Sequence, residues 1–228
     1  FGSRAVREVF VRRMADVGVR RRPGGLPPML VVCLMVLASM VAPAREVTVR
    51  LAKGEVLRLQ LEDYVAGVLM GEASTFTSAE ARKAMAVAAR TWAVSHLGRH
   101  KAEGYDFCES THCQDFRLRG GVSDAVREAV DGTESEMLWY QGRPAATFYH
   151  RHCGGHTAAG SEIWPGLWAP YLRAAPDTFC LTRGRAEWSR EVDEPARITA
   201  RTASGRVLEV LVGSRRISGD RFPSNRFE

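Results

Sequence analysis

Two kinds of apolar pattern follow one another along the chain, one with the period of a strand and one with the spacing of a helix. Residues 47–60 read VTVRLAKGEVLRLQ and alternate on both sides of a Lys-Gly pair, so we expect a β-hairpin. Residues 61–70 carry apolar side chains at helical spacing, at positions 61, 64, 65, 68 and 69. We expect Gly71 to end this helix and to leave Glu72 just beyond it, where its side chain can project into a cleft.

A second, longer and Ala-rich helix is expected over residues 78–97. Thr77 is the predicted N-cap, and Glu80 follows three residues later, as in a capping box. The apolar stripe of this helix is expected to consist of Ala81, Ala84, Met85, Ala88, Trp92 and Ala93. So much alanine allows a neighbouring element to approach closely, and we therefore expect this helix to be central.

The rest of the chain predicts one more short helix and two more hairpins. The helix is expected over residues 124–130. One hairpin is expected to pair 137–140 with 145–150, and the other to pair 197–202 with 206–212. Helices and antiparallel strands are mixed here without a βαβ rhythm, and this predicts the α+β fold class.

The N-terminal segment has the pattern of a secretory signal. Arg20, Arg21 and Arg22 precede an apolar run over residues 29–41, and Ala42-Pro43-Ala44 follows it. The run is shorter than the roughly 20 residues of a spanning helix. We expect residues 1–44 to be a signal peptide cleaved after Ala44, or else an uncleaved signal anchor that makes the only membrane contact. Residues 45–228 contain no low-complexity linker, so we expect them to form one domain. This domain is then exported, to the periplasm, the cell wall or the outer face of the inner membrane.

The charge of the chain argues against a nucleic-acid partner. The net charge is +6, but residues 1–44 hold seven arginines against two acids, a net of +5, which leaves +1 for the rest. The expected mature part is thus nearly neutral and lacks the basic surface that a phosphate backbone requires.

Glu72 and Arg90 are the candidates for catalytic chemistry. A carboxyl group that delivers a proton to a glycosidic oxygen needs a raised pKa, which apolar neighbours such as Leu69, Met70 and Phe76 favour. Residue patterns alone also allow a solvated loop acid at Glu72. Arg90 lies within the Ala-rich helix, where a charge is costly unless paired. It can pair with Glu72, bind substrate, or serve only as a paired charge in the core.

Cysteines and histidines crowd the middle of the chain. Cys108, His112 and Cys113 lie within six residues, and thiolate with imidazole favours a structural zinc site. The fourth ligand is expected to be His100 or Cys153, with His100 preferred. Export favours disulfides instead, among Cys108, Cys113, Cys153 and Cys180. Free thiols are the third alternative.

Four segments together resemble the stage II sporulation protein D (SpoIID/LytB) family, over roughly residues 47–180. They read LEDYVAGVLMGEAS, AVAARTWA, CESTHCQ and FYHRHCGGHTA. The resemblance implies a lytic transglycosylase that cleaves peptidoglycan glycan strands, with Glu72 as the catalytic residue, zinc near the Cys/His loop and a substrate groove lined near His150. Trp164 and Tyr171 can stack on sugar faces, although core packing explains them equally well.

The family also implies a rival function, that of a non-catalytic protein that stimulates a cell-wall amidase. A zinc hydrolase is disfavoured because the sequence has no HExxH pair. The C-terminal sequence ISGDRFPSNRFE is shorter than the family's usual ending, which puts the last strands in question.

Overall fold

The computed structural model describes residues 9–13 and 45–219, except 119, 151, 165, 168, 184–188 and 190. These residues form two compact units, one up to Phe148 and one from Tyr149 onward. Both helices and mainly antiparallel strands are present, which confirms the α+β class. The apolar run at 29–41 lies outside the described residues. Within them, no helix has the length and apolar character to cross a membrane.

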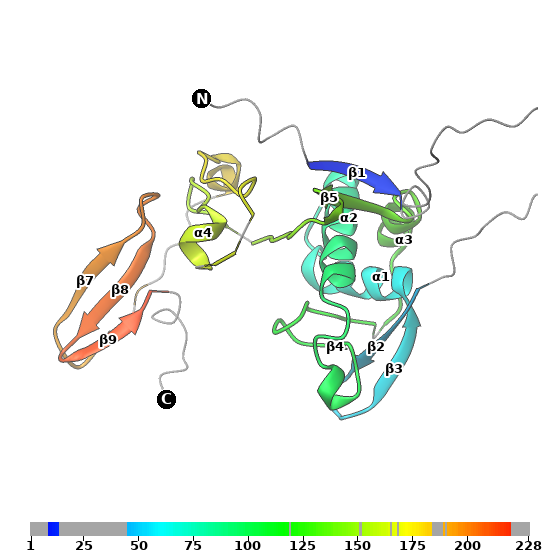
Figure 1. Ribbon diagram of the computed structural model, residues 1–228, viewed down its shortest axis with the longest axis horizontal. Coiled ribbons are helices and arrows are strands. Elements are labelled where there is room, and N and C mark those ends of the chain that lie inside the picture. The colour runs from blue at the N-terminus through cyan, green and yellow to red at the C-terminus, as the bar shows by residue number, and fades with distance from the viewer. Residues whose placement is uncertain are drawn as a thin grey trace, which may run out of the picture. The chain divides into compact units, whose positions relative to one another are not determined.

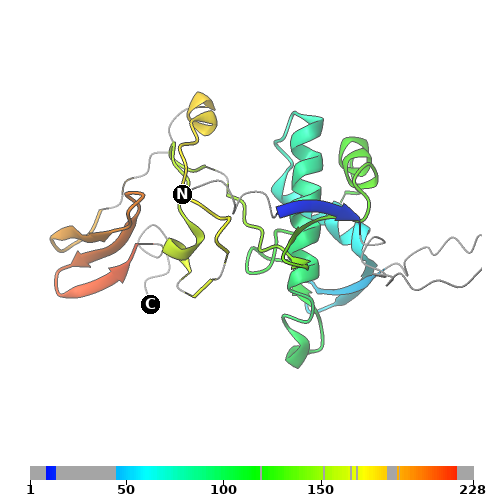
Figure 2. The same cartoon turned by 45° about the horizontal axis from the view of Figure 1, so that its top comes forward.

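The first unit packs three helices between two small sheets (Figure 1 and Figure 2). Helix α1 (Leu61–Glu72) packs on strands β2 (Glu46–Arg50) and β3 (Val56–Gln60). Helix α2 (Ala79–Ser95) contacts α1, α3 (Asp124–Asp131) and strand β5 (Glu136–Tyr140). The Ala-rich helix is therefore central, as predicted.

The sheet under α1 has the order β3-β2-β4. Strands β2 and β3 form the predicted antiparallel hairpin, with Val49 opposite Leu57. Strand β4 (Phe107–Cys108) joins the other edge of β2 in parallel. This short parallel pair was not predicted, and it brings the Cys/His loop against the hairpin.

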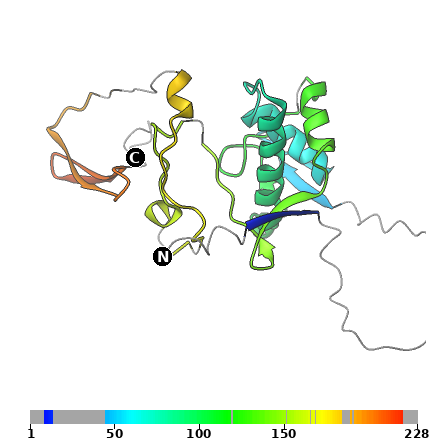
Figure 3. The same ribbon diagram turned by 90° about the horizontal axis from the view of Figure 1, so that it is seen from above.

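The second sheet has the order β1-β5-β6, with β1 at Val9–Arg13 and β6 at Arg143–Pro144. β1 runs antiparallel alongside β5 (Figure 3). The prediction of a strand over 145–150 is wrong, because strand β6 ends at Pro144. Ala145 N still donates a hydrogen bond to Leu138 O of β5. The chain then turns to α2, where the Thr147 hydroxyl donates to the carbonyl of Ala88 at 3.0 Å.

Three local predictions need correction. Gly71 does not end α1, which continues through it to Glu72. The N-cap of α2 is Ser78 and not Thr77, since the Ser78 hydroxyl accepts from Ala81 N. Ala84 is exposed, and the buried face of α2 is wider than the predicted stripe, because it includes Ala86, Ala89 and Arg90.

The second unit contains helix α4 (Gly160–Ile163), a 3-10 turn η4 (Phe179–Arg183) and a three-stranded antiparallel sheet. The sheet consists of β7 (Ala196–Arg201), β8 (Val207–Val212) and β9 (Arg215–Ser218). The predicted third hairpin is therefore confirmed as β7 and β8. β9 extends the sheet, and its last residues, Ile217 and Ser218, are the first two of the segment ISGDRFPSNRFE.

Candidate functional site

Glu72 is the last residue of α1, and its carboxylate is held by the loop that follows the Cys/His cluster. Its Oε1 accepts a hydrogen bond from the backbone N–H of Asp115 at 2.9 Å. The side chain is half-buried, at the end of a helix whose residues 64–69 are buried in the core. The structure thus fixes the direction of this carboxylate without withdrawing it from solvent.

Two glycines, one helical turn apart, allow the loop to approach α1 so closely. A Cβ atom on Gly71 would lie 2.0 Å from the carbonyl oxygen of Asp115, and one on Gly67 would lie 2.3 Å from the ring of Phe116. Arg117 N also donates to the carbonyl of Gly67 at 2.9 Å. Only residues without a side chain leave this room, so the glycines determine how near the loop comes to Glu72.

Asp115 brings a second carboxylate close to Glu72. The sequence pattern did not predict this residue as part of the site. Its side chain accepts two hydrogen bonds from Arg117, from Nε at 3.1 Å and from Nη2 at 2.8 Å. The carboxylate of Asp115 raises the pKa of Arg117, and the charge of Glu72 contributes in the same direction. The site therefore holds two carboxylates and one guanidinium.

A groove of about 450 Å³ opens next to this group. Its apolar walls come from the β2–β3 hairpin and the loop, and its polar groups are two acids and one arginine. The lining residues are Leu51, Leu57, Glu109, Asp115, Phe116, Arg117 and Leu118. Such a mixture of apolar surface with a few polar groups is typical of small-molecule sites.

Arg90 is completely buried, and the carboxylate it pairs with is Glu62 rather than Glu72. Arg90 Nε lies 2.9 Å from Glu62 Oε1, and Nη2 lies 2.6 Å from Glu62 Oε2. The guanidinium also donates to the carbonyls of Glu136 and Val130. Arg90 therefore links α1, α2, α3 and β5, as expected of a paired charge in the core. A direct role of Arg90 in substrate binding stays a prediction.

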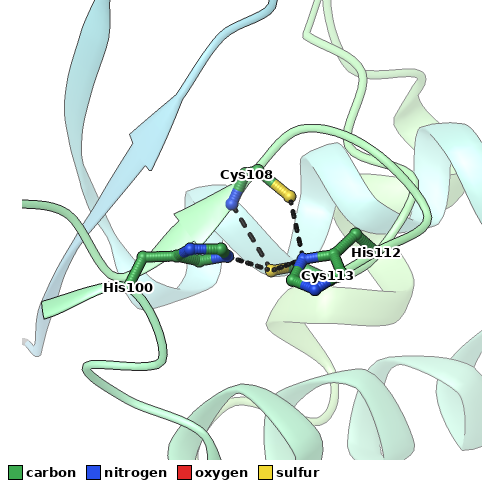
Figure 4. Close-up of side chains that lie close together, drawn as sticks. All are labelled: His100, Cys108, His112 and Cys113. Carbon is green, nitrogen blue, oxygen red and sulfur yellow. Dashed lines mark hydrogen bonds between the residues drawn. The ribbon is translucent and has the colours of Figure 1, made fainter. Parts of the chain in front are cut away.

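The residues predicted to hold a metal lie together. His100, Cys108, His112 and Cys113 each offer a ligand atom, and the four atoms lie within 4.8 Å of one another (Figure 4). His100 comes from the turn before a short 3-10 helix (Lys101–Glu103), and the other three come from β4 and the loop after it. Cys108 and Cys113 are not joined in a disulfide.

Three N-to-S distances within this cluster are close to those around one tetrahedral ion. Cys113 Sγ lies 3.4 Å from His100 Nε2 and 3.8 Å from His112 Nδ1, and Cys108 Sγ lies 3.6 Å from His112 Nδ1. Zinc bound at about 2.3 Å from sulfur and about 2.0 Å from nitrogen, with tetrahedral angles, would place such N and S atoms about 3.5 Å apart. The donor set therefore fits zinc in size and chemistry.

Glu103 contacts His100 on the side of the ring opposite the thiols. The Nδ1 of His100 lies 2.8 Å from Glu103 Oε1, while the Tyr105 hydroxyl donates to the other oxygen of Glu103 at 2.5 Å. The His100 contact, with that from Tyr105, lowers the pKa of Glu103 and keeps it a carboxylate. A carboxylate behind a histidine is common at zinc sites, because it fixes the tautomer that presents the opposite nitrogen.

The two thiols of the cluster differ in acidity. Burial raises the pKa of Cys108, but hydrogen bonds with Ser110 and His112 outweigh it and bring this pKa to about 6. At Cys113 burial prevails and raises the pKa to about 11. Without a metal, one thiolate and one thiol therefore face each other across the cluster at neutral pH.

The other predicted substrate residues belong to the second unit. His150 is exposed, Trp164 is 43% exposed and Tyr171 is half-buried. Gly154 and Gly155 both have positive φ, 73° and 98°, as expected of a tight turn. They belong to a different unit from Glu72, and their roles stay predictions.

Comparison with known proteins finds a family match within the first unit. The family model described as SpoIID, stage II sporulation protein, matches residues 52–140. An amidase enhancer of Bacillus subtilis is 33% identical over 114 residues, which cover 49% of this chain and 15% of that protein. Stage II sporulation protein D of Bacillus amyloliquefaciens is 23% identical over 201 residues, 75% of this chain and 58% of that protein.

A third relative, an uncharacterised protein of Brachyspira hyodysenteriae, is 37% identical over 123 residues, which cover 54% of this chain and 33% of the relative. The chain thus spans less than two thirds of the length of each of these three relatives. The matched region contains Glu72, the groove and the Cys/His cluster.

Proposed function

We propose that the chain is a lytic transglycosylase acting on the glycan strands of peptidoglycan, since residues 52–140 match the family model of the stage II sporulation protein SpoIID. The observation that carries the proposal is the placement of Glu72. It is a half-buried carboxylate at a helix end, and its oxygen accepts from the backbone N–H of Asp115, a residue that lines the groove. Nearly neutral charge after residue 44 agrees with a glycan substrate.

The proposed reaction needs one residue to act first as acid and then as base. Protonated Glu72 gives its proton to the glycosidic oxygen as the bond from the muramic acid C1 breaks. The 6-hydroxyl of the same muramic acid then attacks C1 and returns a proton to Glu72. A 1,6-anhydro end forms, no water is consumed, and Glu72 is restored.

Because Asp115 is a second carboxylate near Glu72, the type of product must distinguish the proposed reaction from hydrolysis. Hydrolases of glycosidic bonds use two carboxylates, and the second activates water or attacks the sugar. Both oxygens of Asp115 are engaged by Arg117, which favours a positioning role over that of a base. Anhydro ends therefore support the proposal, and ordinary reducing ends would assign Asp115 to catalysis.

The test is incubation of the full chain with glycan strands stripped of stem peptides, followed by mass spectrometry of the products. Glu72→Gln keeps the size and polarity of the side chain but cannot transfer the proton, so we expect a loss of roughly 100-fold or more. Glu80→Gln alters an exposed acid of α2 and is the matched control. Normal product release by Glu72→Gln would refute the assignment.

Stimulation of an amidase is the second candidate function, favoured by the likeness to a protein named amidase enhancer. In that role the chain would bind an amidase or its peptidoglycan substrate without cleaving glycan. An N-acetylmuramoyl-L-alanine amidase assay with and without the chain tests it. Stimulation that survives in Glu72→Gln would establish this function independently of the first.

We also propose that His100, Cys108, His112 and Cys113 hold a structural zinc ion. Four protein ligands would leave no open position for substrate, so the ion would stabilise the loop rather than take part in bond cleavage. The support is the N-to-S spacing and the Glu103 contact behind His100. Metal analysis of the full chain, purified without chelators, is expected to give about one zinc per chain.

A further inference from the structure

The Cys/His cluster contains two thiols whose sulfur atoms lie close to each other (Figure 4). Cys108 belongs to β4, and Cys113 follows five positions later, on the loop after this strand. Their Sγ atoms lie within 4.8 Å of each other, and the backbone N–H of Cys108 donates to Cys113 Sγ at 3.4 Å. Both thiols are free, so the pair can react.

A disulfide between these two residues requires little movement of the chain. The bond is about 2.05 Å long and joins residues whose Cα atoms usually lie about 4.4–6.8 Å apart. Because Cys113 Sγ already contacts the backbone of Cys108, the side chain of Cys113 spans most of that separation. Rotation of both side chains about their Cα–Cβ bonds can therefore bring the sulfur atoms into bonding distance.

The loop between the two cysteines is held at both ends, which confines any rearrangement to its exposed part. On one side Cys108 pairs with Arg50 of β2. On the other side Gln114 is buried, and its side-chain oxygen accepts from the Tyr64 hydroxyl at 3.1 Å. Residues 110–112 between these anchors are exposed. Oxidation can thus change their path without opening the core of the first unit.

The same two sulfur atoms are half of the ligand set proposed for zinc. A cysteine binds a metal ion as the thiolate, and a disulfide removes both thiolates at once. His100 and His112 would then be left, which is two of the four ligands of a structural site. The disulfide and the bound ion therefore exclude each other.

We propose that Cys108 and Cys113 form a reversible disulfide, and that its formation removes the capacity of the cluster to bind zinc. The inference rests on the proposed zinc site and adds a redox control to it. The cluster has a dithiol state that binds the ion and a disulfide state that does not. The expected export makes both states relevant, because cysteines outside the cytoplasm meet disulfide-forming conditions.

The oxidant in this reaction is another disulfide, of a small thiol or of an oxidoreductase. Sγ of Cys108, the less buried of the two, attacks one sulfur of that disulfide, which forms a mixed disulfide and releases a first thiol. Sγ of Cys113 then attacks Cys108 Sγ and releases a second. The pair loses two electrons, and the oxidant gains them. The two protons come from the cysteine thiols, or from water where the thiolates held an ion.

Peptide masses and zinc content test the proposal on the full chain, with zinc bound and after removal of the metal. The probe is oxidised glutathione, and trypsin releases both cysteines in one peptide, residues 102–117. We expect this peptide to become lighter by two hydrogens and bound zinc to fall at least about tenfold. Dithiothreitol should restore both. A stable glutathione adduct on this peptide, or zinc retained by the disulfide form, would overturn the proposal.

Two substitutions locate the reaction. Cys113→Ser should stop it at the mixed disulfide, so that the peptide gains one glutathione instead of losing hydrogens. Cys153→Ser removes a half-buried thiol of the second unit and is the matched control, which should leave the peptide mass change and the zinc release as they were. If Cys153→Ser abolishes the change, Cys153 is the partner and the assignment is refuted. If Cys113→Ser fails to fold, the peptide from the unsubstituted chain still decides.

The disulfide and the zinc site can fail separately, because the metal-free protein reports on the thiols alone. Metal-free protein that forms the internal disulfide, but takes up no zinc when reduced, would support the disulfide and refute the zinc site. Protein that binds zinc, but forms no internal disulfide once the metal is removed, would keep the zinc site and refute this inference.

Discussion

At the scale of single residues, Glu72 and Arg90, which the sequence allowed to pair, have separate surroundings. Glu72 ends α1 and accepts from Asp115 N, whereas Arg90 is buried against Glu62, an acid in the first turn of the same helix. A fully buried guanidinium needs a partner, and the sequence could not tell which of the nearby acids supplies it. The choice depends on how α1 and α2 cross.

We expect Arg90→Met to destabilise the fold by about 3 kcal/mol, because it leaves Glu62 without its partner in a largely buried position. Arg127→Met is the matched control, since it removes a half-exposed pair with Asp63 and should cost less than about 1 kcal/mol. Urea unfolding measures both. An Arg90→Met protein with normal stability and lost activity would instead restore the role in substrate binding.

Alkylation should distinguish the two thiols in metal-free protein. Cys108, with a pKa of about 6, is mostly thiolate at pH 7, and its reaction with iodoacetamide should rise as the pH passes through about 6. Cys113, with a pKa of about 11, should react slowly until far higher pH. Peptide mapping after short exposures measures this, and bound zinc should protect both. Equal rates at pH 7 would contradict the difference in acidity.

At the scale of elements, the close approach of a loop to α1 decides the geometry of the site. Helix α1 presents Gly67 and Gly71 on one face, and residues 115–117 lie against them. The sequence indicated only that Gly71 breaks the helix. In the structure Gly71 is helical, and its small size matters because of what packs on it.

Gly71→Ala therefore should destabilise the protein, although alanine is the better helix former by about 1 kcal/mol. The added Cβ would meet the Asp115 carbonyl, and overpacking of this kind costs about 1–3 kcal/mol. It should also displace the N–H that aims Glu72 and reduce product release. Ala84→Gly, at an exposed position of α2, measures the helix-propensity difference alone. A gain of stability in Gly71→Ala would show that the loop is free to move away.

At the scale of the whole molecule, the proposed acid, the groove and the metal cluster belong to the first unit, whereas His150, Trp164 and Tyr171 belong to the second. The sequence shows no linker where the units divide, near Tyr149, and for that reason one domain was expected over residues 45–228. The division into two units follows from which residues contact one another, and the composition of the chain does not predict those contacts.

A fragment of residues 45–148 should fold and bind zinc as the full chain does, because all four ligands and their packing partners lie within it. Circular dichroism and metal analysis of fragment and full chain test this. The fragment lacks β1, so β5 loses an edge partner of five residues, and we expect a lower Tm with the same zinc content. A folded fragment without zinc would show that the cluster needs residues outside it.

The sequence by itself determined the local elements and the chemical inventory of this protein. Periodicity predicted α1, α2 and the β2–β3 hairpin, because apolar spacing directly reflects which face is buried. The close spacing of Cys108, His112 and Cys113 predicted their clustering, since residues in one short loop cannot lie far apart. Glu72 was singled out as an acid expected just beyond an apolar helix, and the resemblance to a known family implied its catalytic role.

Only the tertiary structure decided which distant groups meet. The pairing of Arg90 with Glu62, the approach of Asp115 to Glu72 and the contact of His100 with Cys113 join residues 28, 43 and 13 positions apart. Each depends on helix crossing or on the path of a loop over two glycines. Helix crossing and loop path are properties of packing in three dimensions, and the periodicity of a sequence does not predict them.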